Sequence, residues 1–387
     1  MAARSTTAPT AALHSDPARC VFAIEMSGAS WVIGVLRPDA NKMSLHKIDA
    51  RDADALIALM ARVRCQAEAA LGAPGAIASC YEAGYDGFWL HRRLEAEGIA
   101  NHVIDPASLQ VNRRARQVKT DRIDAGRLLR ALCAHLRGEP KVVSVVRVPT
   151  PEQEDARRLH RERSRLITER VGHVNRIKGL CATHGITDYQ PLRRDRWERL
   201  EVLVTGDGRP FPPALKAEIG RELKRLELVL AMIAEVEAER DALVTEAAPP
   251  HPNAAKIRAL ARLKGIGPEF ASVLVGEVFY RAFDNRRQLA GYVGLAPSPY
   301  ASGATSRDQG ISKAGNAKAR TSMIELTWMW LRHQPGSALS VWFRNRVGEL
   351  KGRPRRIAVV ALARKLLIAL WRYLEGGLVP TGAVLKA

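Results

Sequence analysis

The 387-residue chain is long enough for two or three domains, and its 47% hydrophobic and 26% charged residues are typical of a soluble globular protein. Its 60 Lys and Arg residues outnumber its 40 Asp and Glu residues and give a formal net charge of +20, which indicates a polyanionic partner. The five scattered cysteines form no Cys-x-x-Cys pair, which argues against a zinc site or a disulfide framework and favours a reducing cytoplasm.

The two ends of the chain give no sign of a membrane or secretory segment. Residues 1–19 are rich in Ala, Ser, Thr and Pro without a continuous apolar core, so they are predicted to be a disordered leader. The apolar segment at 357–371 is interrupted by Arg364 and Lys365 and is too short and too charged to span a bilayer. We therefore expect no membrane partner.

Residues 20–149 alternate between short apolar runs and helical patterns, which predicts an α/β domain. The first three runs have short turns between them and predict an antiparallel meander. The whole order is strand (21–25), strand (31–36), strand (43–48), helix (53–71), strand (76–81), helix (88–97), strand (99–104) and helix from 121. Because ligands of open α/β sheets bind outside the strand ends, Glu25 and Glu82 are expected to converge there.

A second acidic pair opens the helix that follows the last of these strands. Residues 119–124 read KTDRID, in which Thr120 is a natural N-cap and Asp121 and Asp124 share one helix face. A hard cation such as Mg²⁺, or Mn²⁺, would relieve the repulsion between these carboxylates. The alternative is a capped helix start whose acids are balanced by Arg122 and Arg127.

The element order and the Lys-Thr-Asp-x-x-Asp pattern resemble the RuvC-like, RNase H-type domain of the DEDD transposases of the IS110 insertion-sequence family. The resemblance implies that Glu25, Glu82, Asp121 and Asp124 are catalytic and bind divalent metal, with Lys119 and Arg122 beside the nucleic acid. That family usually has Asp where this chain has Glu25, and the extra methylene would place the metal farther from the strand.

Residues 150–248 carry two long helical patterns, from Pro151 and from 214 to 244, joined by a Gly- and Pro-containing break. Two such helices predict an antiparallel coiled-coil arm. The first is rich in arginine between 157 and 170. The arm is either a dimerisation element with a side that faces RNA or DNA, or a solvated pair of helices that links two domains.

Residues 249–387 are predicted to be mainly helical. The stretch 263–268 is typical of a helix-hairpin-helix turn, in which Lys264, Gly265 and Gly267 hold a phosphate through the backbone, although a plain helical turn fits as well. Downstream, 292–303 is expected to be a Pro-rich loop that presents serines. A Gly-punctuated turn at 310–316 then leads into a helix whose start carries Lys313, Lys318 and Arg320.

A hydroxyl beside such a basic helix start suits attack on a phosphodiester. The residues alone do not choose between Ser298, Ser302, Ser306 and Ser312. The Gly-Leu-x-Pro, Ser-Gly and Gly-x-Ser-Lys-x-Gly-Asn stretches, however, resemble the carboxy-terminal transposase domain of the same family. In that domain the Ser-Gly serine is the strand-cleaving nucleophile, and this serine is Ser302 here.

The resemblance covers about residues 21–374 and implies a recombinase that forms a covalent phosphoserine link to DNA. It further implies double-stranded DNA partners (element ends and target), a structured guide RNA encoded by the element, and a homo-oligomer, either dimer or tetramer. Two alternatives stay open. One is a junction-resolving nuclease that uses the acids and water; the other is a non-catalytic nucleic-acid-binding protein in which Glu25 marks a decayed metal site.

Overall fold

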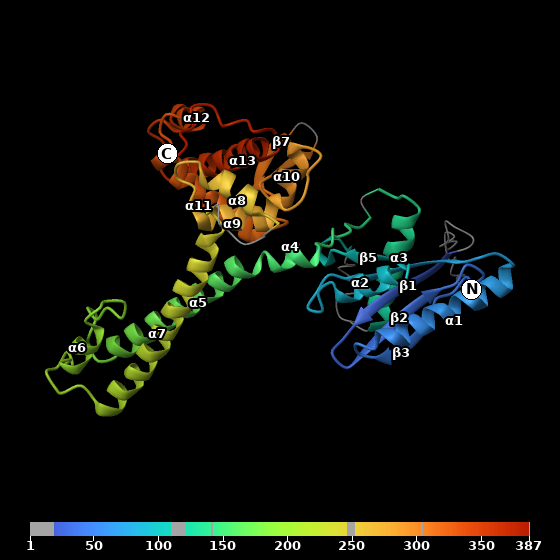
Figure 1. The fold of residues 1–387 in the computed structure, drawn as a ribbon, viewed down its shortest axis with the longest axis horizontal. Coiled ribbons are helices and arrows are strands. Elements are labelled where there is room, and N and C mark those ends of the chain that lie inside the picture. Colours follow the sequence, from blue (N-terminus) through green and yellow to red (C-terminus); the bar gives the residue numbers. More distant parts are fainter. Residues whose placement is uncertain (1–18, 110–120, 141, 246–251, 303–304, 387) are drawn as a thin grey trace, which may run out of the picture. The chain divides into compact units, whose positions relative to one another are not determined.

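The computed structural model (Figure 1) describes residues 19–109, 121–140, 142–245, 252–302 and 305–386, with only the backbone of 301–302 and 305–308. The chain divides into two compact units, residues 1–148 and 149–387, which we describe separately. The expected leader, as far as residue 18, and both Lys119 and Thr120 lie outside the described residues.

Unit 1 is built on a five-stranded mixed sheet with the order β3-β2-β1-β4-β5. Strands β1, β2 and β3 form the predicted antiparallel meander, whereas β4 and β5 run parallel to β1. Parallel neighbours need crossover connections, which helices α1 and α2 supply. The bounds are β1 (Arg19–Met26), β2 (Ser30–Leu36), β3 (Ser44–Asp49), α1 (Ala53–Leu71), β4 (Ala76–Glu82), α2 (Trp89–Ala96), β5 (Ala100–Ile104), η1 (Pro106–Ser108) and α3 (Asp121–Leu136). The predicted α/β domain is therefore confirmed.

The two faces of the sheet have different helical covers, and the side chains of β1 show which is which. Phe22 and Ile24 belong to the core with α1 and α2, whereas Val21 and Ala23 belong to the core with α3. Side chains alternate between the faces of a strand, so every second residue of β1 points toward α3. This alternation determines on which face of the sheet a side chain at the end of a strand lies.

Unit 2 begins with two long helices that pack along each other, as predicted. Ion pairs join Arg163 to Glu237 and Arg176 to Glu218, so positions ascend on one helix as they descend on the other and the pair is antiparallel. Its bounds are α4 (Pro151–Asp155), α5 (Arg158–Ala182), α6 (Arg196–Glu201) and α7 (Pro213–Ala242). The first expected helix is in fact two, α4 and α5. Coiled-coil packing of the pair remains a prediction.

Several cations of this arm are neutralised by acids on its other helices. Arg163 contacts Glu237 at 2.6 Å, Arg176 contacts Glu218 at 2.7 Å, and Arg196 contacts Glu227 at 2.6 Å. Exposed pairs of this kind add little stability, but they cancel charge. The arm therefore contributes less to a nucleic-acid-binding surface than its sequence indicates.

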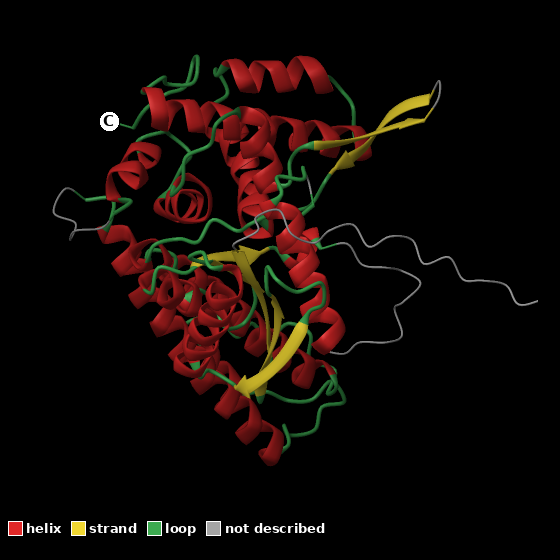
Figure 2. Ribbon diagram, turned by 90° about the vertical axis from the view of Figure 1, so that its right-hand side faces the viewer, coloured by secondary structure: helices red, strands yellow, loops and turns green. Residues whose placement is uncertain are grey.

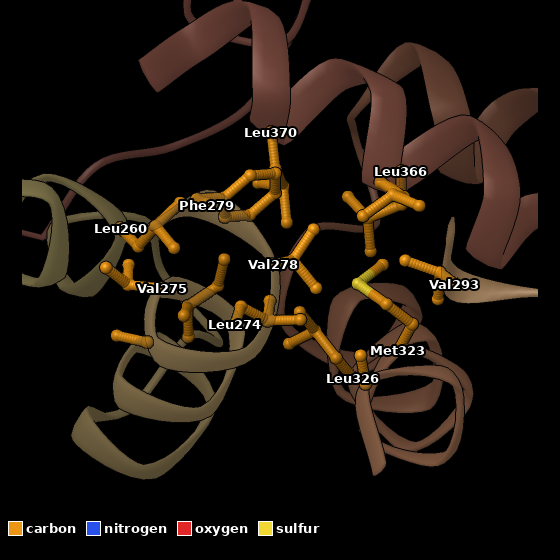
Figure 3. Close-up of a cluster of buried hydrophobic side chains, with 14 of the residues drawn as sticks. Leu260, Leu274, Val275, Val278, Phe279, Val293, Met323, Leu326, Leu366 and Leu370 are labelled. Carbon is orange, nitrogen blue, oxygen red and sulfur yellow. The ribbon is translucent and has the colours of Figure 1, made fainter. Parts of the chain in front are cut away.

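The rest of unit 2 is a helical domain with one β-hairpin. Its helices surround an apolar core that includes Leu274, Val278, Met323 and Leu366 (Figure 3). The bounds are α8 (Ala254–Ala261), α9 (Pro268–Leu274), the π-helical turn η3 (Val275–Phe279), α10 (Arg286–Val293), β6 (Pro297–Ser302), β7 (Thr305–Ile311), α11 (Ala317–His333), α12 (Ala338–Val347) and α13 (Arg353–Gly376). No helix in the described ranges has the length and apolar character needed to cross a membrane.

The expected Pro-rich loop is wrong, because its second half is strand β6, which pairs with β7 and projects from the helices (Figure 2). Two-stranded hairpins have only edge strands, and proline is tolerated on edges. Pro297 and Pro299 stand on either side of a register shift in the pairing. The prolines that suggested a loop are therefore compatible with a strand.

Candidate functional site

One candidate site is an acidic edge of the unit 1 sheet. Ile24 pairs with Tyr81 in the parallel β1–β4 register, so Glu25 and Glu82 follow side by side at neighbouring strand ends. Strand alternation puts Glu25 on the same face as Ala23, and Glu82 on the same face as Cys80. Since Ala23 and Cys80 both pack against α3, the two glutamates lie on the face that α3 covers.

Helix α3 brings the other two acids to the same face. It crosses the sheet from β2, where Ala125 contacts Gly34, to β5, where the His135 ring lies 5.4 Å from that of His102. Asp124 immediately precedes Ala125, so the acidic first turn of α3 begins near β2, the antiparallel neighbour of β1. Asp121 is exposed and Asp124 is half-buried.

Asp124 has one satisfied and one unsatisfied oxygen. Arg127 donates to its Oδ1 at 3.1 Å, as the capped-helix alternative predicted, whereas Arg122 is exposed. Its Oδ2 is buried and accepts no hydrogen bond from any described residue. A buried carboxylate oxygen without a donor costs about 1–3 kcal/mol, so a bound cation or solvent at this position is physically favoured.

The donor set is chemically suited to Mg²⁺ or Mn²⁺, because all four side chains offer hard carboxylate oxygens. Among the described residues, however, no group of three or more His, Cys, Asp or Glu side chains is arranged closely enough to hold a metal ion. Four carboxylates repel one another, so they gather only around a cation. The structure thus places the predicted acids on one face without bringing them into coordination distance.

Asp105, which follows β5, lies at the same end of the sheet, but one of its carboxylate oxygens already accepts a hydrogen bond. Val103 packs with α1 and α2, so alternation turns Asp105 away from α3. Its Oδ1 accepts a hydrogen bond from the Ala107 backbone at 2.9 Å and caps η1. Asp105 is therefore a structural acid and a matched control for Asp124.

A second candidate site, in unit 2, is the base of the β6–β7 hairpin, where two of the sequence motifs interlock. Gly294 and Gly315 have φ values of +71° and +74°. A Cβ atom on Gly294 would overlap the Ala314 carbonyl oxygen, and one on Gly315 would overlap the Tyr292 carbonyl oxygen. The spacing of these glycines is therefore explained by two turns in direct backbone contact.

The four candidate serines lie at different distances from this interlocked base along the hairpin. The Ser312 backbone donates to the Ala296 carbonyl at 2.9 Å, at the base, and Ser298 lies near the start of β6. Ser302 ends β6 and pairs with Thr305, and Ser306 pairs with Ala301, both near the tip. The side chains of Ser302 and Ser306 lie outside the described part of the chain.

A buried ionic network, which the sequence predictions missed, supports this base. The Glu277 side chain is 3% exposed and accepts hydrogen bonds from His160 Nε2 at 2.8 Å, Arg161 Nε at 2.8 Å and Asn316 Nδ2 at 2.8 Å. Burial opposes its charged form, but these hydrogen bonds outweigh burial and hold the pKa of Glu277 well below its ordinary range. The available signal was a lone acid within the apolar run 273–279.

Asn316 connects that network to the hairpin and to α11. Its backbone donates to the Tyr292 carbonyl at 2.8 Å, and its Oδ1 accepts from the Ala319 backbone at 3.0 Å as the N-cap of α11. Its Nδ2 donates to Glu277. One side chain therefore links α11, the hairpin base and η3, whose π-helical geometry is frequent at functional sites.

The predicted helix-hairpin-helix turn is present between α8 and α9, and it is partly covered. A Cβ on Gly265 would lie 2.9 Å from the His333 Cβ of α11, so this glycine allows close packing. The Lys264 backbone donates to the Val384 carbonyl at 3.0 Å. Gly267 adjoins open space. The plain-turn alternative therefore explains Gly265, and phosphate binding by the turn remains a prediction.

The three cations predicted at the start of α11 have different environments. Lys313 is exposed and has a φ of +57°. Lys318 donates to Ser164 Oγ of α5. Arg320 Nη1 donates to the Val293 and Ala314 carbonyls, each at 3.2 Å, and so ties the hairpin base together. Lys313 is the one of the three that is fully available to an external anion.

Lys313 and Arg320 also line a groove of about 1020 Å³ beside the hairpin base. Six further cations, which the sequence did not assign to nucleic-acid binding, line it too: Arg286, Arg287, Arg353, Arg356, Arg364 and Lys365. The helical spacing of Arg353, Arg356 and Arg364 on α13 was the available signal. Other cations of the groove come from α10 and from near the hairpin, and tertiary packing brings them to the groove.

Comparison with known proteins identifies relatives of the whole chain. A family model described as "Transposase IS116/IS110/IS902 family" matches residues 257–341. The chain is 51% identical over 386 residues to y4rJ of Sinorhizobium fredii, a protein assigned as a transposase, and the match covers 98% of this chain and 97% of that protein. It is 27% identical over 287 residues to the transposase for insertion sequence element IS1111A of Coxiella burnetii (73% and 74% covered). It is 26% identical over 227 residues to the transposase for IS1328 of Yersinia enterocolitica (57% and 63% covered).

Proposed function

Because the chain belongs to the IS116/IS110/IS902 family of insertion-sequence transposases, we propose that it cuts and rejoins DNA with the acidic edge of unit 1 and a serine of unit 2. The observation that supports the proposal is that Glu25 and Glu82 follow at neighbouring strand ends on the sheet face that α3 covers, and that the first turn of α3 carries Asp121 and Asp124. An RNase H-like, RuvC-like role for unit 1 accounts for acids at these strand ends.

In this proposal Glu25, Glu82, Asp121 and Asp124 hold Mg²⁺ or Mn²⁺. When bound, the ion supplies charge stabilisation and orientation for the scissile phosphate. The unpartnered Oδ2 of Asp124 and the all-oxygen donor set support this assignment. Glu25 keeps the carboxylate of the usual Asp, and its extra methylene would place the ion farther from the strand.

The Oγ of Ser302 is the proposed nucleophile. It forms a bond to the scissile phosphorus and loses its proton, while the bond from phosphorus to the leaving oxygen breaks and that oxygen gains a proton. The product is a phosphoserine link that preserves one phosphodiester for rejoining. Attack by the hydroxyl of another strand then reverses the chemistry, joins the strands and releases Ser302.

The proposed partners are double-stranded DNA at the element ends and target, a structured guide RNA and further copies of this chain as a dimer or tetramer. The net charge of +20 supports a polyanionic partner. A guide RNA accounts for the lack of a recognisable base-reading motif in the sequence. Because Ser302 and the acids belong to different units, one active site can combine groups from two protomers.

The test is to incubate the protein with element-end DNA, the flanking non-coding RNA and Mg²⁺, and to look for a protein–DNA adduct on a denaturing gel. Ser302→Ala and Asp124→Ala should each abolish the adduct, whereas Ser298→Ala and the control Asp105→Ala should retain it. An adduct that survives Ser302→Ala would overturn the serine assignment. Cleaved DNA without an adduct would indicate the water-using nuclease instead.

A mixing experiment tests whether protomers share the site. Equal amounts of the Ser302→Ala and Asp124→Ala proteins should together restore adduct formation if the serine of one protomer acts with the acids of another. Each variant alone is the control. No recovery in the mixture would place the serine and the acids within a single protomer.

A further inference from the structure

The groove beside the β6–β7 hairpin is a strongly basic concavity. Residues of α10, the hairpin, α11 and α13 line it over about 1020 Å³. Four cations come from α13, namely Arg353, Arg356, Arg364 and Lys365. Four more come from the other elements, namely Arg286, Arg287, Lys313 and Arg320. No Asp or Glu is among the lining residues whose side chains the structure describes.

These cations are not balanced inside the protein. Within the described residues, none of the eight forms an ion pair with a carboxylate, in contrast to the paired arginines of the arm. Arg320 donates to backbone carbonyls, and Lys365 Nζ lies 4.7 Å from the centre of the Trp342 ring. Eight like charges around one groove repel one another, and an external polyanion relieves that repulsion.

The groove lining is aliphatic as well as basic. It includes Ile311 of β7, Ile324 of α11, and Ile357, Val360 and Ile368 of α13. The Ile357 side chain is 59% exposed and is therefore accessible to a ligand. A ligand that fits both kinds of lining residue offers phosphates to the cations and an apolar surface to the aliphatic side chains.

A single nucleic-acid strand meets both requirements better than a duplex does. In a duplex the base faces are stacked inside and phosphates line the outside, so the aliphatic lining residues would face only charge and sugar. An unpaired strand exposes base faces that pack on apolar surfaces while its phosphates remain outside. Among the described lining residues, Gln309 is the one uncharged polar side chain, so most of the hydrogen-bonding side chains are cations suited to phosphates.

The groove is also within reach of the proposed nucleophile. Pro297, at the start of β6, lines the groove, and Ser302 ends the same strand five residues later. At about 3.3 Å per residue the strand covers roughly 17 Å. That length corresponds to about five stacked nucleotides at 3.4 Å each.

We propose that this groove binds single-stranded DNA, the stretch of strand next to the phosphate that Ser302 attacks. The inference rests on the proposed function for its position in the reaction, but binding itself requires neither Ser302 nor metal. Unpaired strand is what a transposase exposes when it separates a cut strand from its complement. The groove holds that strand between cleavage and rejoining.

The test measures fluorescence anisotropy of a short labelled oligothymidylate with the full-length protein in EDTA. The groove variant is the double substitution Arg356→Ala and Arg364→Ala. The control is Arg355→Ala and Arg372→Ala, which removes the same charge from the same helix outside the groove lining. Because the groove variant can neutralise two fewer phosphates, its slope of log affinity against log salt should be smaller than that of the wild type by about 1.4, whereas the control should keep the wild-type slope.

A second variant tests the aliphatic part of the groove lining separately from its charge. Ile357→Ser removes an exposed apolar side chain, so the fold should be retained, as circular dichroism would verify. We expect weaker binding of the single strand with an unchanged salt slope. Ser302→Ala should bind the oligonucleotide as the wild type does, so failure to form an adduct and failure of groove binding are distinguishable.

Three outcomes would overturn the proposal. Equal weakening by the groove pair and the control pair would show a general effect of net charge. Tighter binding of a duplex of the same length, with the same sensitivity to the groove variant, would make the groove a duplex surface. Tighter binding of a matched single-stranded RNA would assign the groove to the RNA partner.

Discussion

The clearest structural prediction concerns the buried carboxylate of Glu277. Glu277→Gln preserves the size of the side chain but removes its charge and turns one acceptor oxygen into an NH₂ donor. At the Oε1 position that donor would face His160 and Arg161, and at the Oε2 position it would face Arg161 and Asn316, all of which donate to the present carboxylate. The substitution therefore replaces attraction with donor-to-donor conflict at the centre of the network.

The size of the effect follows from which donors can recover water. The Arg161 side chain is 57% exposed and can be rehydrated, whereas His160 is 1% exposed and Asn316 is half-buried. Each buried donor left unsatisfied costs about 1–3 kcal/mol. Removing one partner of a buried ion pair costs about 3–5 kcal/mol in other proteins. We expect Glu277→Gln to lower the free energy of unfolding of unit 2 by about 3 kcal/mol.

Urea unfolding of the full-length protein, followed by circular dichroism, measures this loss. The control is Glu218→Gln, which makes the same chemical change in an exposed pair with Arg176 on the arm. This control should cost less than about 1 kcal/mol. Because the two units can unfold separately, the transition of unit 2 must be identified before the data are fitted.

The pH dependence provides an independent check. The folded-state pKa of Glu277 lies below its ordinary value of 4.5, so its contribution is fully present above that value and is lost as the pH falls below it. The stability difference between wild type and Glu277→Gln should therefore be constant near neutrality and shrink in acid. A difference below about 0.5 kcal/mol at neutral pH would refute the assigned role of the network.

Three further outcomes are expected. Gly294→Ala places a Cβ against the Ala314 carbonyl oxygen at a positive φ, so it should destabilise unit 2 and abolish the adduct. Gly291→Ala in helix α10, where the added Cβ meets open space, should do neither. A thermal melt and the adduct assay measure the two effects. Gly276→Ala would place a Cβ 2.6 Å from His160 Cε1 and should lower the unfolding midpoint by several degrees. EDTA should abolish the adduct without weakening binding of the single-stranded oligonucleotide, as gel and anisotropy measurements can establish.

The sequence predicted unit 1 well because local signals agree with the final fold there. The helix expected over 53–71 has those bounds in the structure, since the Asp52 side chain accepts from the Ala55 backbone at one end and Gly72 adopts a left-handed conformation at the other. The strands are short apolar runs separated by turns, and their order left few topologies to consider. The sheet edge that gathers Glu25 and Glu82 follows from that order.

The sequence predicted unit 2 less well because its key features depend on distant partners. Proline at 297 and 299 indicated a loop, yet pairing with β7 overrode that local preference. Glu277 looked like an interruption of an apolar run, because its partner His160 is 117 positions away. The basic groove combines residues from four elements, so no single stretch of sequence displays it.

The proposed catalytic groups lie in two different units of the chain. The proposed chemistry therefore requires bound DNA. In unit 2, interlocked glycines and the Glu277 network fix the base of the hairpin that carries Ser302. In unit 1, by contrast, the described acids share a face without a group close enough to hold an ion. Mutual repulsion keeps such carboxylates apart until cations are present, and a DNA phosphate adds a further oxygen ligand for those cations. In the proposed mechanism the nucleophile and the acids are therefore held by different physical means, and a DNA strand that reaches both would bring them together.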